Sequence, residues 1–134
     1  YEARAHGADV VLLIVAALSK NQLEDYFHLS TELGMRSLIE VHTNDELERA
    51  LEISPEIIGV NSRNLKTLEV DARAFAELIP QIPSSIARVA ESGISTRDEV
   101  VFAQECGATA ILVGEALVRS ESPSVAINQL LGRL

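Results

Sequence analysis

Cysteine is almost absent from this sequence of 134 residues, because Cys106 is its only one. A single cysteine excludes an intrachain disulfide and a cysteine-based metal cluster, and it fits the reducing environment of the cytoplasm. Basic residues are scarce as well, with 11 Lys and Arg against 20 Asp and Glu, for a formal net charge of −9. This balance argues against nucleic acid and anionic membranes as partners.

The sequence also lacks the long hydrophobic run that a membrane span needs. Its longest apolar run, residues 10–18, is about half as long as a bilayer-crossing helix. No basic segment leads into an apolar stretch near the start, so no signal peptide is visible. The content of 47% hydrophobic and 23% charged residues is typical of globular proteins and predicts a single domain over residues 1–134.

What the sequence does contain is a repeated unit in which glycine precedes an apolar segment, at residues 7–13, 34–40 and 107–113. Glycine accepts the left-handed conformation that ends helices, so each copy predicts a helix end followed by a strand. The strands are apolar on both faces, as in a parallel sheet covered by helices. Predicted strands are residues 10–16, 37–42, 57–61, 87–91 and 110–114; predicted helices are residues 21–33, 44–51, 72–79 and 97–106, with a last helix from Ser122 to near Gly132.

Five consecutive βα units are compatible with two α/β architectures. One is a doubly wound sheet of the flavodoxin type, and the other is part of a (β/α)8 barrel. A complete barrel takes about 250 residues, so this chain could form only part of one. Residues 1–6 resemble the last turns of a helix, which suggests a longer parent sequence.

Polar side chains stand where the predicted strands end, at Glu40, Asn61, Arg63 and Glu91. Their convergence at one edge of a parallel sheet would favour a ligand site, since buried polar groups need partners. Two carboxyl groups that share an enclosed site can act as acid and base, although Glu40 alone fits a structural ion pair equally well. His42 follows its strand and is predicted to be a solvated loop residue.

The last two predicted strands are each followed by a glycine and a helix start, at Gly93 and Gly114. Glycine lets the backbone approach a ligand closely, and amide groups at a helix start donate hydrogen bonds to phosphate oxygens. In barrels such a site often follows the seventh and eighth strands. The pair of glycines therefore predicts a phosphate site. His6 and His28 have no spacing that indicates a metal site.

Five segments resemble the indole-3-glycerol phosphate synthase family, in the same order along the chain. They are LLIVAAL at 12–18, LIEVH at 38–42, IGVNSRNLKTL at 58–68, AESGI at 90–94 and LVGEAL at 112–117. The resemblance implies a partial TIM-type (β/α)8 barrel made of its fourth to eighth βα units. It also implies a lyase of tryptophan biosynthesis that converts 1-(2-carboxyphenylamino)-1-deoxyribulose 5-phosphate to indole-3-glycerol phosphate, with loss of CO2 and water and without a cofactor or metal.

The same resemblance assigns roles to individual residues. Those implied are Glu40, Asn61 and Glu91 in catalysis, Leu13, Arg63 and Ser92 in substrate binding, and Gly93, Gly114 and Glu115 in phosphate binding. Members of the family also carry a Glu and a Lys on the first strand and a general-acid Lys on the third, and this chain contains neither strand. We therefore expect the chain by itself to be inactive, and to associate with itself through uncovered barrel edges.

Two other interpretations stay open at this point. One is a non-catalytic doubly wound domain that binds a phosphorylated ligand, which a flavodoxin-like strand order would support. The other is a different phosphosugar-binding barrel enzyme such as an isomerase, although the run at residues 61–68 argues against it.

Overall fold

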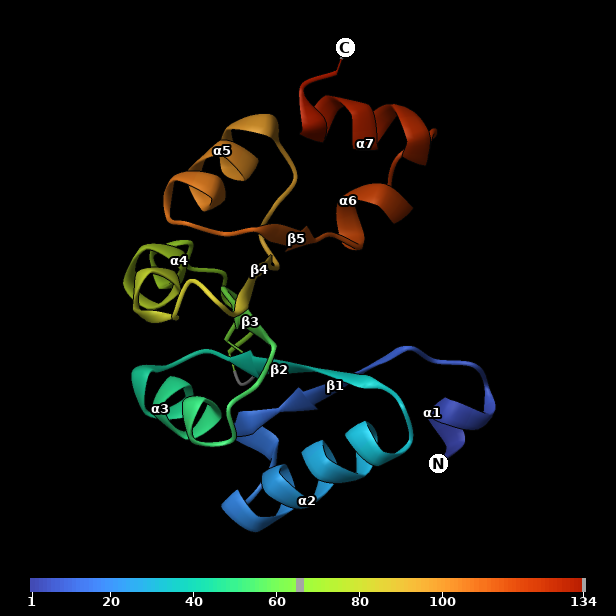
Figure 1. Ribbon diagram of the computed structural model, residues 1–134. Coiled ribbons are helices and arrows are strands. Elements are labelled where there is room, and N and C mark those ends of the chain that lie inside the picture. Colours follow the sequence, from blue (N-terminus) through green and yellow to red (C-terminus); the bar gives the residue numbers. More distant parts are fainter. Residues whose placement is uncertain (65–66, 134) are drawn as a thin grey trace.

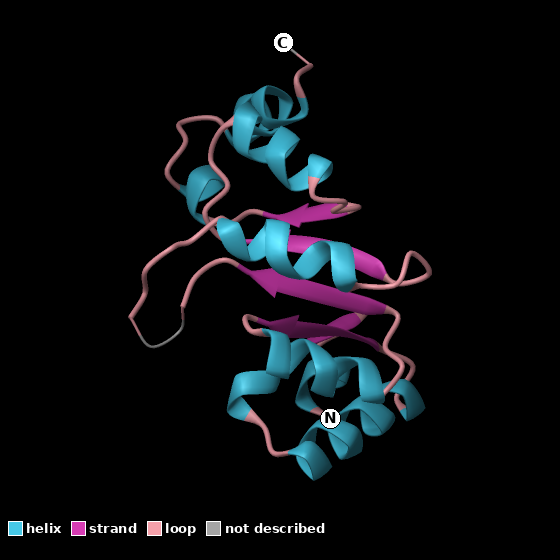
Figure 2. Ribbon diagram, turned by 90° about the vertical axis from the view of Figure 1, so that its left-hand side faces the viewer, coloured by secondary structure: helices cyan, strands magenta, loops and turns pink. Residues whose placement is uncertain are grey.

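A computed structural model of the protein describes residues 1–64 and 67–133, and its centre is one sheet of five parallel strands. The strands are β1 (Val10–Ile14), β2 (Arg36–Val41), β3 (Ile57–Asn61), β4 (Ala87–Glu91) and β5 (Ala110–Leu112). Each strand pairs with the next one along the chain, in the order β1-β2-β3-β4-β5, and Figure 2 shows them stacked in one sheet. The consecutive order excludes the flavodoxin-like alternative and confirms the predicted series of βα units.

Helices connect the strands. They are α1 (Glu2–Ala5), α2 (Lys20–Glu32), α3 (Asn44–Glu52), α4 (Arg73–Leu78), α5 (Arg97–Glu105), α6 (Glu115–Val118) and α7 (Pro123–Leu131), with short 3₁₀ helices at Val15–Ala17 and Ile79–Gln81. In Figure 1, α3, α4 and α5 lie on the same side of the sheet. Of the helices in residues 1–64 and 67–133, none has the length and apolar character needed to cross a membrane.

Helix starts follow from local side-chain hydrogen bonds. Thr96 and Glu99 form the predicted capping box of α5, in which each side chain accepts from the other residue's backbone N–H. Ser19 and Gln22 form a second one, so α2 begins at Lys20, one residue earlier than predicted. Such caps stabilise a helix by about 1 kcal/mol, because they satisfy backbone donors that lack helical partners.

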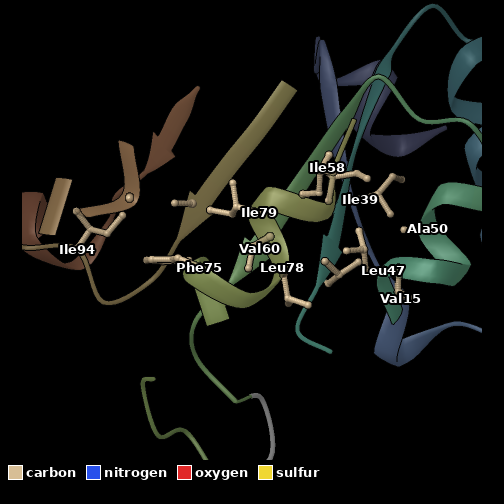
Figure 3. Packing of buried hydrophobic residues seen from close by; sticks show 14 of the residues in the cluster. Val15, Ile39, Leu47, Ala50, Ile58, Val60, Phe75, Leu78, Ile79 and Ile94 are labelled. Atoms are coloured by element: carbon tan, nitrogen blue, oxygen red, sulfur yellow. The ribbon is translucent and has the colours of Figure 1, made fainter. Parts of the chain in front are cut away.

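The hydrophobic core lies between the sheet and its helices. Figure 3 shows Ile39 of β2 near Leu47 and Ala50 of α3. The opposite face of the sheet is open at its outer strands, where Leu12 of β1 is 48% exposed and Leu112 of β5 is 51% exposed. Because side chains alternate between faces along a strand, the sheet has one helix-covered face and one open face.

Candidate active site at the carboxyl ends of the strands

The three predicted catalytic side chains converge where β2, β3 and β4 end. Asn61 is paired in register with Glu91, and Glu40 is paired with Gly59, two residues before Asn61. All three side chains come from buried residues, with exposures of 6% for Glu40, 6% for Asn61 and 3% for Glu91. The end of the sheet therefore brings two buried carboxyl groups and one buried amide together on the face opposite the helix-covered core.

The two carboxyl groups interact with each other. Burial, the charge of Glu40 and a hydrogen bond with the Glu40 side chain together raise the pKa of Glu91 to about 7. Glu91 Oε1 is buried and receives no hydrogen bond from the described protein groups. With its pKa raised to about 7, Glu91 is partly protonated near neutral pH, so its carboxyl group can both donate and accept a proton there.

Asn61 is held from two sides. The side-chain oxygen Oδ1 of Asn61 accepts a hydrogen bond from the backbone N–H of Arg63 at 2.9 Å. The backbone carbonyl oxygen of Asn61 lies 2.6 Å from Nδ1 of His42. A carbonyl can only accept, so Nδ1 of His42 carries the proton. His42 is half-buried by this contact, so the prediction of a solvated loop histidine was wrong: β2 and β3 lie side by side and bring it against Asn61.

The turn after β4 has a left-handed backbone at two successive residues, Ser92 with φ 65° and Gly93 with φ 66°. Ser62, which is fully buried, donates through its hydroxyl to the Ser92 carbonyl at 3.0 Å and through its N–H to the Glu91 carbonyl at 3.0 Å. A Cβ at Gly93 would lie 2.4 Å from Val70 Cγ1. Ser62, directly after β3, therefore fixes the turn, and a side chain at Gly93 would have to displace the Val70 side chain.

A cleft of about 1010 Å³ opens beside this turn. Six of the nine predicted site residues line it, namely Arg63, Glu91, Ser92, Gly93, Gly114 and Glu115. Within it, Glu115 Oε2 lies 3.3 Å from Arg63 Nη2, and Glu115 Oε1 lies 3.0 Å from Arg119 Nη2. The cleft lining thus carries the guanidinium groups of Arg63 and Arg119 together with the carboxyl groups of Glu91, Glu99 and Glu115.

The structure does not bring Leu13 to this cleft. Leu13 is 8% exposed and belongs to the core cluster, together with residues of the helices. Its neighbours Leu12 and Ile14 point to the other face of the sheet, since side chains alternate along β1. Leu65 and Lys66, which belong to the motif at residues 58–68, lie outside the described residues.

Three residues near the site were not predicted from the sequence. Gly59 lies under the Glu91 carboxylate, Ser62 holds the turn after β4, and Arg119 lines the cleft. A signal for Arg119 was available, because it stands four residues after Glu115, directly after α6. The roles of Gly59 and Ser62 depend on contacts between neighbouring strands. The described residues contain no group of three or more His, Cys, Asp or Glu side chains that could hold a metal ion.

Comparison with known proteins places this chain in a family. The model of the indole-3-glycerol phosphate synthase family matches residues 1–130. The indole-3-glycerol phosphate synthase of Kineococcus radiotolerans is 53% identical over 98% of this chain, which corresponds to 48% of that protein, and the one of Rhodococcus jostii is 50% identical, with 98% and 49% covered. The chain thus spans about half the length of these curated relatives.

Solved structures support the fold. Thiamine phosphate pyrophosphorylase from Pyrococcus furiosus superposes with a TM-score of 0.77 at 20% identity, over 98% of this chain and 61% of that one. A 3-hexulose-6-phosphate synthase also gives 0.77, at 14% identity, over 99% and 65% of the two chains. At such low identity the likeness concerns the fold alone. Together with the five consecutive parallel strands, it identifies this sheet and its helices as a partial TIM-type barrel.

Proposed function

The chain belongs to the indole-3-glycerol phosphate synthase family, and from this premise we propose that it supplies part of the active site of a carboxy-lyase of tryptophan biosynthesis. The substrate is 1-(2-carboxyphenylamino)-1-deoxyribulose 5-phosphate, and the product is indole-3-glycerol phosphate. The observation that carries this proposal is the buried pair of Glu40 and Glu91 next to a cleft with the Gly93 turn and two guanidinium groups.

The proposed chemistry needs protons to move near the closing ring. Ring closure forms a carbon–carbon bond between the aromatic ring and the ribulose carbonyl carbon, CO2 leaves from the ring, and the new hydroxyl departs as water. Glu91, with its pKa raised to about 7, can deliver a proton to a departing oxygen while Glu40 accepts one. Asn61 orients the substrate, because the Arg63 N–H fixes its amide oxygen.

We propose that the phosphate group of the substrate binds in this cleft. Backbone N–H groups around Gly93, Gly114 and Glu115 would donate to its oxygens, as glycine-rich turns and helix starts do. Ser92 and Arg63 line the same cleft and would contact the rest of the substrate. Leu13 contributes only through the packing of β1 in the core.

The isolated chain is proposed to be inactive. The family's first- and third-strand lysines, including the general acid that protonates the carbonyl, belong to strands that this chain does not contain. The purified 134-residue chain should therefore form no detectable indole-3-glycerol phosphate, and turnover near that of a complete synthase would contradict this part of the proposal. We further propose the cytoplasm as the place of action, in keeping with the single thiol of Cys106.

The function itself is tested by restoring the other half. The chain is joined, as one polypeptide, to the N-terminal half of the Kineococcus relative. Formation of indole-3-glycerol phosphate is then measured by fluorescence. We expect turnover, and a loss of about 100-fold to 10,000-fold in kcat for Glu91→Gln, the usual range for an acid or base. Glu105→Gln, an exposed change at the end of α5, is the matched control and should keep full activity. A joined enzyme that folds and converts only a different phosphosugar would support the other barrel function instead.

A further inference from the structure

Glycine occupies the middle of β3, where it is an unfavourable choice. Gly59 lies between Ile58 and Val60, which are both fully buried. Glycine weakens a strand interior because it has no side chain to pack and loses more backbone freedom on folding. Its place here therefore needs a reason from its surroundings.

The space next to the Gly59 backbone is occupied by the Glu91 side chain, with Leu38 close by. A Cβ built on Gly59 would lie 1.7 Å from Oε1 and 2.8 Å from Cδ of Glu91, and 3.2 Å from Cδ1 of Leu38. The first two distances are far below van der Waals contact. The Glu91 carboxyl group thus rests on the bare backbone of β3, in the space that any other residue at position 59 would occupy.

The same backbone position lies next to Glu40. Gly59 is paired in register with Glu40 on β2 and with Val89 on β4. Glu91 stands two residues after Val89, and its side chain extends back over Gly59. This brings the Glu91 carboxyl group toward Glu40, with which it interacts by charge and by a hydrogen bond. A side chain at position 59 would displace the carboxyl group from this place.

We propose that Gly59 is a positioning residue that holds the Glu91 carboxyl group beside Glu40, by leaving open the space in which that group lies. This inference rests on the proposed function only for its catalytic meaning. A glycine with no steric role at position 59 predicts the opposite behaviour, because alanine loses less backbone freedom on folding and would strengthen β3.

The first test measures the pKa of Glu91 in the 134-residue chain by carbon NMR of glutamate side chains labelled at the carboxyl group. In Gly59→Ala we expect the pKa of Glu91 to fall by about one unit or more, because the displaced group gains water and leaves the Glu40 charge. An unchanged or higher pKa would overturn the proposal. Gly114→Ala is the control for this readout, since its added methyl meets no atom within 4 Å, and the titration of Glu91 should stay as in the parent chain.

The second test uses stability and covers the case in which Gly59→Ala folds poorly. The added methyl should lower the thermal midpoint in the parent chain and should lower it much less in a Glu91→Ala background, where the obstructing carboxyl group is gone. An equal loss in both backgrounds would overturn the proposal, because the conflict would then lie elsewhere. Neither readout involves turnover, so the positioning role and the synthase function can fail separately.

Discussion

The hydroxyl of Ser62, at the end of β3, donates a hydrogen bond of 3.0 Å to the carbonyl oxygen of Ser92, in the turn that follows β4. Ser62 is fully buried, and Ser92 has a left-handed backbone at φ 65°. A non-glycine residue keeps such a conformation only where its surroundings hold it. This single contact therefore connects the strand that carries Asn61 to the turn proposed to bind phosphate.

Removing the Ser62 hydroxyl should loosen that turn. We expect Ser62→Ala to lower the free energy of unfolding by about 1 kcal/mol, the usual value of a buried hydrogen bond. Phosphate binding, measured from NMR shifts of the chain titrated with inorganic phosphate, should weaken about threefold to tenfold. Ser30→Ala is the matched control, because Ser30 is buried and its hydroxyl also donates to a carbonyl, that of Tyr26, within α2. If both variants bind phosphate as the parent does, the Ser62 contact does not shape the site.

Stability should fall as the pH rises from 5 to 8. In the folded chain the pKa of Glu91 is raised to about 7 from its ordinary value of 4.5, so between these pH values the folded chain holds a proton that the unfolded chain has lost. The resulting stabilisation is complete below about pH 4.5 and disappears as the pH passes 7, with a loss of about 2 kcal/mol over this window. Urea unfolding at pH 5 and pH 8 measures it.

Glu91→Gln is the control for this pH dependence, because it removes the titrating group and should flatten the profile. Asp71 and Glu99, whose pKa values are lowered by hydrogen bonds from Arg73 and from the Ser95 backbone respectively, lose their contributions only at lower pH. A profile of equal slope in Glu91→Gln and the parent chain would show that another group is responsible.

Neutralising Glu115 should strengthen phosphate binding. Its carboxylate pairs with both Arg63 and Arg119 in the cleft, and it adds a negative charge near the proposed phosphate position. In Glu115→Gln the backbone N–H is kept and both guanidinium groups are released, so we expect the affinity for inorganic phosphate to rise about threefold to tenfold at low salt and less at high salt. Glu121→Gln, an exposed change outside the cleft, should leave the affinity as it was. Weaker binding in Glu115→Gln would instead assign its carboxylate a direct role in holding the site together.

The isolated chain should associate with itself through its outer strands. β1 and β5 each have only one neighbour in the sheet, and Leu12 and Leu112 are about half exposed on the open face. Unpaired strand edges and exposed apolar side chains favour contact with a second copy. Sedimentation should detect species larger than the monomer, and Leu12→Glu should reduce them. Tyr26→Glu, a similar change on α2 where Tyr26 is 43% exposed, should not; a clean monomer at high concentration would contradict the expectation.

Local sequence patterns were sufficient to predict the succession of helices and strands, the capping box at Thr96 and Glu99, and the polar ends of the strands. Each of these depends on neighbours within a few residues, through backbone preferences, caps and alternating polarity. The resemblance to the family added the order of the units within a barrel. Both kinds of information lie along the chain, so they could be read without coordinates.

The side chains that meet across the sheet could not be predicted from local patterns. The apolar run around Leu13 has no alternation that tells its two faces apart, and the structure placed Leu13 in the core and Leu12 on the open face. The contact of His42 with Asn61 and the position of the Glu91 carboxyl group over Gly59 likewise depend on the register between strands. Register is set by the packing of residues far apart in sequence, and a shift of one residue exchanges the faces of a strand.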